Sequence, residues 1–264
     1  MSAPAVSVLM GVRDGAPWVA GAIESILGQT LADLEMIVVD DGSTDSTPMI
    51  LAGLRDPRVV VERQAPAGLT RALGRALARA RAPLVARLDA DDVARPDRLE
   101  RQHAFLAAHP EVGLLGSAAR VVDEAGREVG AIHPPEDDAA LRRDLIRRNP
   151  FVHSSIMARR ALVTHAGGYD PDFSVAQDYD LWLRLAALTR MANLPEALVT
   201  RRLVAGRVTA AREDDRLRAE ARARWRAVRR GSYPPWSALW AVRPLLALAV
   251  PGRVRAVLRR TGGR

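Results

Sequence analysis

Short apolar runs alternate with longer helix-type segments through the first hundred residues, and this alternation limits the chain to few folds. Strands are expected at residues 6–10, 36–39, 59–61 and 84–88, and helices at residues 18–27, 48–54, 69–80 and 96–108. Strands joined by helices make right-handed crossovers, so these residues predict an α/β fold with a parallel sheet covered on both faces. In such sheets, ligands bind beyond the carboxyl ends of the strands.

Three carboxylates follow the fourth expected strand, in the sequence PLVARLDADD at residues 83–92. Asp89, Asp91 and Asp92 lie within four positions, where their charges repel one another. A hard divalent cation with a preference for oxygen ligands would neutralise them, which favours metal or phosphate chemistry. The alternative is an acidic turn that caps the helix expected from residue 96.

A second acidic segment, DDGSTD at residues 40–45, follows the second expected strand. It has two interpretations of about equal weight. Ser43, Thr44 and Ser46 are suited to a turn and to a helix N-cap. Asp41, beside a flexible glycine at a strand end, is also placed to accept hydrogen bonds from a nucleotide base or a ribose.

The pattern changes after residue 108. Strands are expected at residues 112–122 and 128–132 around a turn at residues 124–126, and the region from residue 112 to about residue 205 has a mixed pattern. We expect this region to form the second wall of a cleft. His153, in the sequence NPFVHSS, is either a structural turn residue or an acceptor-side residue.

A third acidic feature, AQDYDLW at residues 176–182, opens a helix. Its apolar stripe is expected at Leu181, Leu185 and Leu188. Asp178 lies where an N-cap residue would be, so capping is one interpretation. If it faces the cleft instead, its carboxylate is a candidate general base toward a hydroxyl nucleophile. Tyr179 and Trp182 are then either part of an acceptor-binding wall or, more commonly for helix aromatics, part of the core.

Taken in order, five segments resemble the family 2 glycosyltransferases, which are inverting enzymes with a GT-A fold. The segments are VSVLMGVRDG, ILGQTLADLEMIVVDDGSTD, GLTRALGRALARARAPLVARLDADDVARPDRL, HSSIMARRAL and GGYDPDFSVAQDYDLWLRL. The resemblance spans about residues 4–209. It implies a Rossmann-like, mostly parallel sheet flanked by helices, with a nucleotide-sugar-binding half at residues 1–111 and a mixed acceptor-binding and catalytic half at residues 112–209. Residues 210–264 would be a basic helical extension.

The resemblance also implies roles for particular residues. Asp178 would be the catalytic base, Asp41 would contact the nucleotide base, and Asp91 would bind Mg²⁺ or Mn²⁺ directly while Asp89 faces the ribose or the metal. Further donor contacts are expected at Gly11, Arg13, Asp14 and Leu69. The implied reaction moves a sugar from a nucleotide-diphospho-sugar, UDP- or dTDP-linked by preference, to a hydroxyl of a glycan or lipid-linked acceptor.

Several positions depart from the family pattern. Arg13 replaces a frequent tyrosine, Gly74 a common asparagine, Gln177 a frequent glutamate, and Val204 a late histidine that often helps to bind the metal. Arg201, Arg202 and Arg207 are candidates to supply part of the missing positive charge. The alternative function is therefore a catalytically weakened nucleotide-sugar-binding or scaffold member of the same fold. A dinucleotide-binding dehydrogenase is disfavoured because GVRDG at residues 11–15 is not GxGxxG.

Basic charge is concentrated in the C-terminal part. Residues 1–200 hold 22 Arg and 27 acidic residues, whereas residues 201–264 hold 17 Arg and 4 acidic residues. No cysteine is present and the N-terminus resembles a strand more than a signal peptide, so we expect a cytoplasmic protein. An apolar segment with two tryptophans lies within residues 232–264, flanked by Arg, and suits peripheral binding to an anionic membrane at the inner face of the plasma membrane. The alternatives are packing on the catalytic domain or dimer formation. Nucleic-acid binding is disfavoured because no RNA-reading motif accompanies the arginines.

Overall fold

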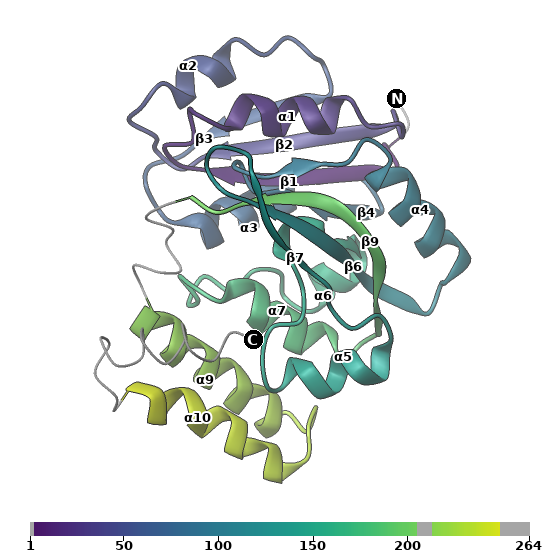
Figure 1. Cartoon of the computed structure of the whole chain (residues 1–264), viewed down its shortest axis with the longest axis vertical. Coiled ribbons are helices and arrows are strands. Elements are labelled where there is room, and N and C mark those ends of the chain that lie inside the picture. The colour runs from purple at the N-terminus through teal and green to yellow at the C-terminus, as the bar shows by residue number, and fades with distance from the viewer. Residues whose placement is uncertain (1–2, 205–212, 249–264) are drawn as a thin grey trace.

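Nine strands form one mixed sheet in the computed structural model, which describes residues 3–204 and 213–248. The order is β3-β2-β1-β4-β8-β6-β9-β5, with β7 paired to β6. Figure 1 shows β3, β2, β1 and β4 in the first half of the sheet and β6, β9 and β7 in the second. The strands are β1 (Val6–Val12), β2 (Leu34–Asp40), β3 (Val59–Arg63), β4 (Leu84–Arg87), β5 (Val93–Ala94), β6 (Val112–Val122), β7 (Glu128–Ile132), β8 (Met157–Arg159) and β9 (Arg190–Arg202). The helices are α1 (Val19–Leu27), α2 (Thr47–Ala52), α3 (Leu69–Arg79), α4 (Arg98–Ala108), α5 (Asp138–Leu145), α6 (Arg160–His165), α7 (Gln177–Leu185), α9 (Glu213–Arg229) and α10 (Ala238–Leu248). Short 3-10 turns lie at η1 (His153–Ser155) and η2 (Pro235–Ser237).

The first four strands of this order are parallel, as the alternation of strands and helices predicted. Side chains of β1 and β2 alternate between the two faces of the sheet. Leu9 and Ile37 pack in one core with α3, α5 and α7, whereas Val8 and Met36 pack in a second core with α1, α2 and α4. Both faces are therefore covered, which explains why these strands are apolar throughout.

The second half of the sheet is mixed. β8 is antiparallel to β4 and to β6, whereas β6 runs parallel to β9. Strands β6 and β7 have the bounds expected from the sequence, with Gly126 at a φ of 81° in the turn between them. The α/β fold with a mixed second half is confirmed.

Two expectations for α7 are wrong. The N-cap position is held by Ala176, at a φ of 55°, so Asp178 lies in the first turn of the helix and does not cap it. Leu188 lies beyond the end of the helix at Leu185 and is exposed, so it does not continue the buried stripe. Tyr179 and Trp182 are buried in the core, and this excludes them from an exposed acceptor wall.

The cap of α2 also differs from the expectation. Ser46 occupies the N-cap position, but its side chain makes no capping hydrogen bond. The backbone N–H of Thr47 instead donates to Oδ1 of Asp45, over 2.9 Å. The DDGSTD segment thus opens α2 through its last aspartate.

A helical hairpin closes the described chain. The strongly charged helix α9 packs on α7, and α10 packs back on α9 (Figure 1). Gly231, at a φ of 73°, lies in the turn between the two helices. Within residues 3–204 and 213–248, every helix is too short or too polar to span a membrane. The expectations for residues 205–212, including Arg207, and for residues 249–264 fall outside the described residues.

Candidate active site

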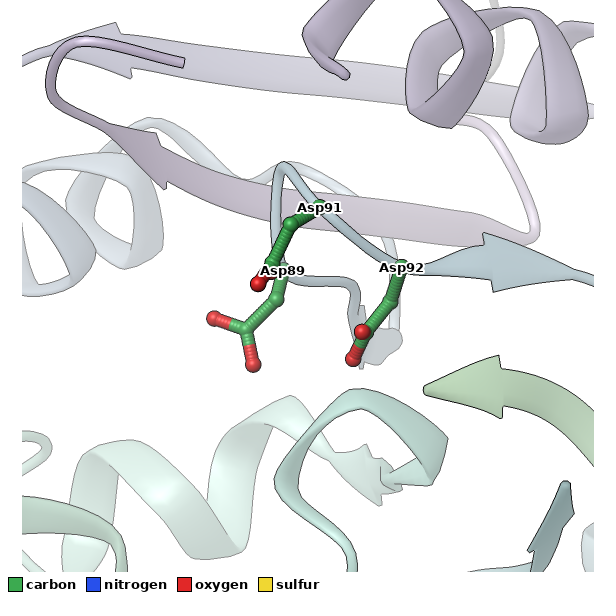
Figure 2. Close-up of side chains that lie close together, drawn as sticks. All are labelled: Asp89, Asp91 and Asp92. Atoms are coloured by element: carbon green, nitrogen blue, oxygen red, sulfur yellow. The ribbon is translucent and has the colours of Figure 1, made fainter. Parts of the chain in front are cut away.

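The three carboxylates after β4 meet in space. Asp89, Asp91 and Asp92 each offer one oxygen, and these oxygens lie within 4.8 Å of one another. All three side chains come from the loop between β4 and β5, and the carboxylates of Asp89 and Asp92 point to the same side of that loop (Figure 2). We call these residues the acidic triad. An all-oxygen, negatively charged donor set of this size fits Mg²⁺ or Mn²⁺.

Asp89 is fixed by a buried cation. Arg87, the last residue of β4, is 2% exposed, and its Nη2 donates to Oδ1 of Asp89. Ser154 Oγ donates to Oδ2 of Asp89 over 2.9 Å and accepts from its backbone N–H over 3.1 Å. Although burial opposes ionisation, the Arg87 charge and these hydrogen bonds hold the pKa of Asp89 down at about 2. This carboxylate is therefore ionised and held in one orientation.

Asp92 has a different environment. It is buried, and its Oδ1 accepts a hydrogen bond from the backbone N–H of Arg202 over 2.9 Å. Burial and the charges of Asp89 and Asp91 raise the pKa of Asp92 to about 7. A cation between the three carboxylates would reverse this shift, since it favours the ionised form.

Arg202, at the end of β9, is engaged beside the triad. Its guanidinium lies 4.3 Å from the ring centroid of Trp18, and its Nη1 donates to the backbone carbonyls of Asp123 and Glu124. The side chain thus joins β9 to the turn before α1 and to the β6–β7 turn. Its positive charge is thus used in contacts with Trp18 and the β6–β7 turn, while its backbone N–H donates to Asp92.

Asp178 lies in the first turn of α7. Asn149 Nδ2 donates to its Oδ2 over 2.8 Å. Burial raises the pKa of Asp178, and the hydrogen bond and the charge of Arg87 oppose the shift. A desolvated carboxylate with a raised pKa is a stronger base than an exposed one.

His153, which the sequence left open, belongs to the same region. Its Nε2 lies 3.0 Å from the hydroxyl of Tyr169, and its ring packs edge-on against Trp182 with centroids 6.0 Å apart. Burial and the Arg87 charge lower the pKa of His153 to about 3, so the imidazole is neutral. Arg87 acts electrostatically on His153, Asp89 and Asp178, and so links the triad to the first turn of α7.

Asp41, the expected contact to the nucleotide base, accepts hydrogen bonds from a neighbouring loop. Its Oδ1 accepts from Gln64 Nε2 and from the backbone N–H of Ala67, both over 2.7 Å, and its Oδ2 accepts from the N–H of Gly68 over 2.8 Å. Gly68 has a φ of 92°, which favours glycine, and α3 begins at the next residue, Leu69. In this structure Asp41 therefore fixes the start of α3.

Gly11 allows α3 to approach β1 closely. A Cβ atom at this position would lie 2.9 Å from Cδ1 of Leu69 and 3.2 Å from Cβ of Ala72. Close packing between β1 and α3 thus explains why a glycine stands at position 11 opposite Leu69. The contacts of Gly11 and Leu69 with a nucleotide-sugar stay predictions.

Asp14 holds the turn after β1 against the DDGSTD segment. At a φ of 51°, its Oδ1 accepts from the backbone N–H groups of Thr44 and Asp45, while its own N–H donates to Ser43 Oγ over 3.0 Å. Arg13 is exposed and lies 3.8 Å from Asp14. These residues stand at the carboxyl ends of β1 and β2, where the sequence placed a ligand site.

The family model described as glycosyl transferase family 2 matches residues 7–166. The chain belongs to glycosyltransferase family 2. The amylovoran biosynthesis glycosyltransferase AmsE of Erwinia amylovora is 34% identical over 181 residues, which are 67% of this chain and 67% of AmsE. The O-antigen biosynthesis glycosyltransferase WbnJ of Escherichia coli is 30% identical over 206 residues, or 75% of this chain and 79% of WbnJ.

Solved structures share the fold of this family 2 glycosyltransferase. The mannosyltransferase PcManGT of Pyrobaculum calidifontis, in complex with GDP-Man and Mn²⁺, superposes with a TM-score of 0.67 at 23% identity, covering 99% of this chain and 80% of PcManGT. TarS of Staphylococcus aureus, in complex with UDP-GlcNAc, gives a TM-score of 0.68 at 20% identity, covering 83% of this chain and 66% of that chain. At these identities the likeness supports the GT-A fold.

Four side chains of the candidate site were not singled out in the sequence. They are Arg87, Asn149, Ser154 and Tyr169. Arg87 carried one usable signal, a charged residue inside the apolar run before the acidic triad. The other three lie in the mixed region, whose path the strand pattern did not define.

Proposed function

We propose that the chain is a metal-assisted inverting glycosyltransferase, hexosyltransferase-like, that transfers a sugar from a nucleotide-diphospho-sugar to a hydroxyl group. UDP- or dTDP-linked donors are preferred in this proposal, and the acceptor is a glycan or a lipid-linked glycan. The observation that carries it is the pairing of the acidic triad at the end of β4 with Asp178 at the start of α7, both under the influence of buried Arg87.

Asp91 and Asp92, with Asp89 beside them, would hold Mg²⁺ or Mn²⁺ against the donor diphosphate. A divalent cation there stabilises the negative charge that develops on the leaving diphosphate. Asp89, held by Arg87 and Ser154, would face the metal or the ribose in this proposal. Arg13, Asp14 and Asp41 then border the nucleotide at the carboxyl ends of β1 and β2.

Asp178 acts as the general base in this proposal. The acceptor oxygen attacks the anomeric carbon, its proton passes to the Asp178 carboxylate, and the bond from the anomeric carbon to the diphosphate oxygen breaks. A single displacement of this kind inverts the anomeric centre. Asn149 orients the carboxylate, and the low pKa of His153, about 3, makes its imidazole a weak base.

The relatives support a role in polysaccharide biosynthesis. AmsE is named for amylovoran biosynthesis and WbnJ for O-antigen biosynthesis. We propose that this chain likewise extends a surface or secreted glycan, in the cytoplasm at the inner face of the plasma membrane. Measuring sugar transfer from a panel of nucleotide-sugars, with and without Mn²⁺, tests the proposed activity. Absence of both transfer and donor hydrolysis, with donor binding intact, would favour the weakened binding protein.

Replacing Asp91 with alanine removes one oxygen ligand from the acidic triad. We expect Asp91→Ala to weaken Mn²⁺-dependent binding of UDP by roughly 100-fold, since metal affinity depends strongly on each ligand and its support. Calorimetric titration of UDP with and without Mn²⁺ measures the effect. Asp172→Ala changes an exposed aspartate far along the chain and should leave binding unaltered. Equal Mn²⁺ dependence in Asp91→Ala and wild type would disprove the metal site.

The raised pKa of Asp178 sets the acidic limb of the rate profile. Only the ionised carboxylate accepts a proton, so the transfer rate should fall as pH decreases through this raised pKa, at a higher pH than for an exposed aspartate. Asn149→Ala removes a hydrogen bond that favours the ionised form, and the limb should move to still higher pH. Measuring kcat against pH for both proteins checks the direction. A limb that moves to lower pH in Asn149→Ala contradicts the assignment.

A further inference from the structure

The outer side of α10 is apolar and exposed. Leu239 is 73% exposed, and the other members of this surface are Trp236, Val242, Leu245 and Leu246. Trp236 lies in η2, just before the helix, and the spacing of three and four residues from Leu239 to Leu246 puts the other four on one side of α10. We call these five residues the α10 face. Large apolar side chains gathered in this way mark an interaction surface.

The inner side of α10 is fixed to the rest of the molecule. Ala241 and Pro244 are buried, and the ring centroid of Trp240 lies 5.0 Å from the guanidinium carbon of Arg147. Arg224 of α9, which is 3% exposed, donates to the backbone carbonyl of Trp240 over 3.3 Å and to the hydroxyl of Tyr179 over 2.8 Å. The α10 face is thus presented by a helix anchored to α7.

Arginines outnumber acidic residues in the described hairpin. Residues 213–248 contain 8 arginines and 4 acidic residues, and the acidic ones, Glu213, Asp214, Asp215 and Glu220, all lie in α9. Arg229 and Arg230 are exposed at the end of α9, and Arg243 is exposed beside the α10 face. An apolar helix face bordered by arginines complements a surface whose outside is anionic and whose interior is apolar.

The same charge disfavours a second copy of the chain as the occupant. A twofold dimer through the α10 face would bring the arginines of both copies together, because such an interface pairs each surface with itself. Like charges at the rim oppose that contact. A lipid bilayer offers anionic headgroups at the height of the arginines and acyl chains at the height of the leucines.

We propose that α10 lies flat on an anionic phospholipid bilayer, with Leu239, Val242 and Leu246 entering the interface and the surrounding arginines at the headgroups. Eleven residues form a helix about 16 Å long, which suits the plane of the membrane and is too short to cross it. Binding to a bilayer would favour the lipid-linked acceptor over a free glycan, an inference that rests on the proposed glycosyl transfer. α10 lies at one end of the long axis and α2 at the other, so the nucleotide-binding half extends away from the bilayer (Figure 1).

Sedimentation of the full chain with vesicles tests the membrane surface. We expect wild type to bind vesicles of phosphatidylcholine with phosphatidylglycerol, and to bind phosphatidylcholine alone much more weakly. Leu239→Glu with Leu246→Glu should weaken binding by roughly tenfold or more, because each change replaces inserted apolar surface with a charge. Met49→Glu is the matched control, since Met49 on α2 is also 73% exposed but lies at the other end of the molecule.

Both substitutions are at exposed side chains, so unchanged thermal unfolding would show that the variant is folded. Binding by the double variant equal to wild type would overturn the proposal, and so would equal binding of wild type to both vesicle types. A concentration-dependent dimer that the double variant abolishes, without vesicle binding by wild type, would assign the face to a second copy. Asp178→Asn should bind vesicles like wild type, so failure of the proposed transfer is distinguishable from failure of the membrane surface.

Discussion

Asp178→Asn should reduce the rate of sugar transfer by about 10²- to 10⁴-fold, the usual contribution of general base catalysis. The amide has nearly the shape of the carboxylate but cannot accept the acceptor proton. Donor binding should persist, because Asp178 lies on α7 whereas the acidic triad follows β4. Single-turnover transfer measures the loss, and titration of UDP with Mn²⁺ measures donor binding.

A matched substitution separates the loss of the base from a general effect of charge. Asp172→Asn removes the same charge from an exposed position in the segment before α7, and transfer should stay within about twofold of wild type. Near-normal turnover of Asp178→Asn would show that another group accepts the proton. Loss of donor binding together with transfer would show instead that Asp178 supports the folded site.

Arg87→Met should destabilise the protein by about 1–3 kcal/mol, because it removes a charged hydrogen-bond partner from Asp89, whose side chain is partly exposed and so is partly screened by solvent. The side chain is 2% exposed, and its removal leaves Asp89 beside Asp91 and Asp92 without the cation that pairs with it. Urea unfolding of both proteins measures the change in the free energy of unfolding.

An exposed arginine provides the comparison. Arg101 forms ion pairs with Asp97 and Glu196, but its side chain is 47% exposed, so Arg101→Met should cost about 1 kcal/mol or less. Asp89→Asn in the Arg87→Met background removes the uncompensated charge and should recover part of the loss. If Arg87→Met cost no more than Arg101→Met, the pair between buried Arg87 and partly exposed Asp89 would contribute little to stability.

The sequence predicted the regular half of the fold well. Strands at residues 6–10 and 84–88 and the helix at residues 18–27 were expected within two residues of their observed ends, because apolar runs and helical spacing are local signals. The two-residue strand β5 was not expected, since its pairing with β9 depends on residues about a hundred positions away. The same applies to β8, whose three residues join β4 to β6.

The site residues show the same difference between local signals and contacts made over long sequence distances. The acidic triad was predicted because its members are adjacent in the sequence, and the structure brings their oxygens together. The loop contacts of Asp41 involve residues more than twenty positions away, and no spacing rule anticipates them. Arg87 is similar, because only the fold shows that a charged residue in an apolar run is buried behind a carboxylate.

The side chain of Arg224 makes the C-terminal extension inseparable from the helix that carries Asp178. It donates to the hydroxyl of Tyr179, the next residue after Asp178, while also holding the carbonyl of Trp240. A chain shortened before α9 would leave the Tyr179 hydroxyl without this donor and would uncover apolar surface of α7. The composition of the sequence changes near residue 210, but the parts before and after this residue are not independent units that could be exchanged. Grafting another tail onto this enzyme would require a replacement for one buried guanidinium.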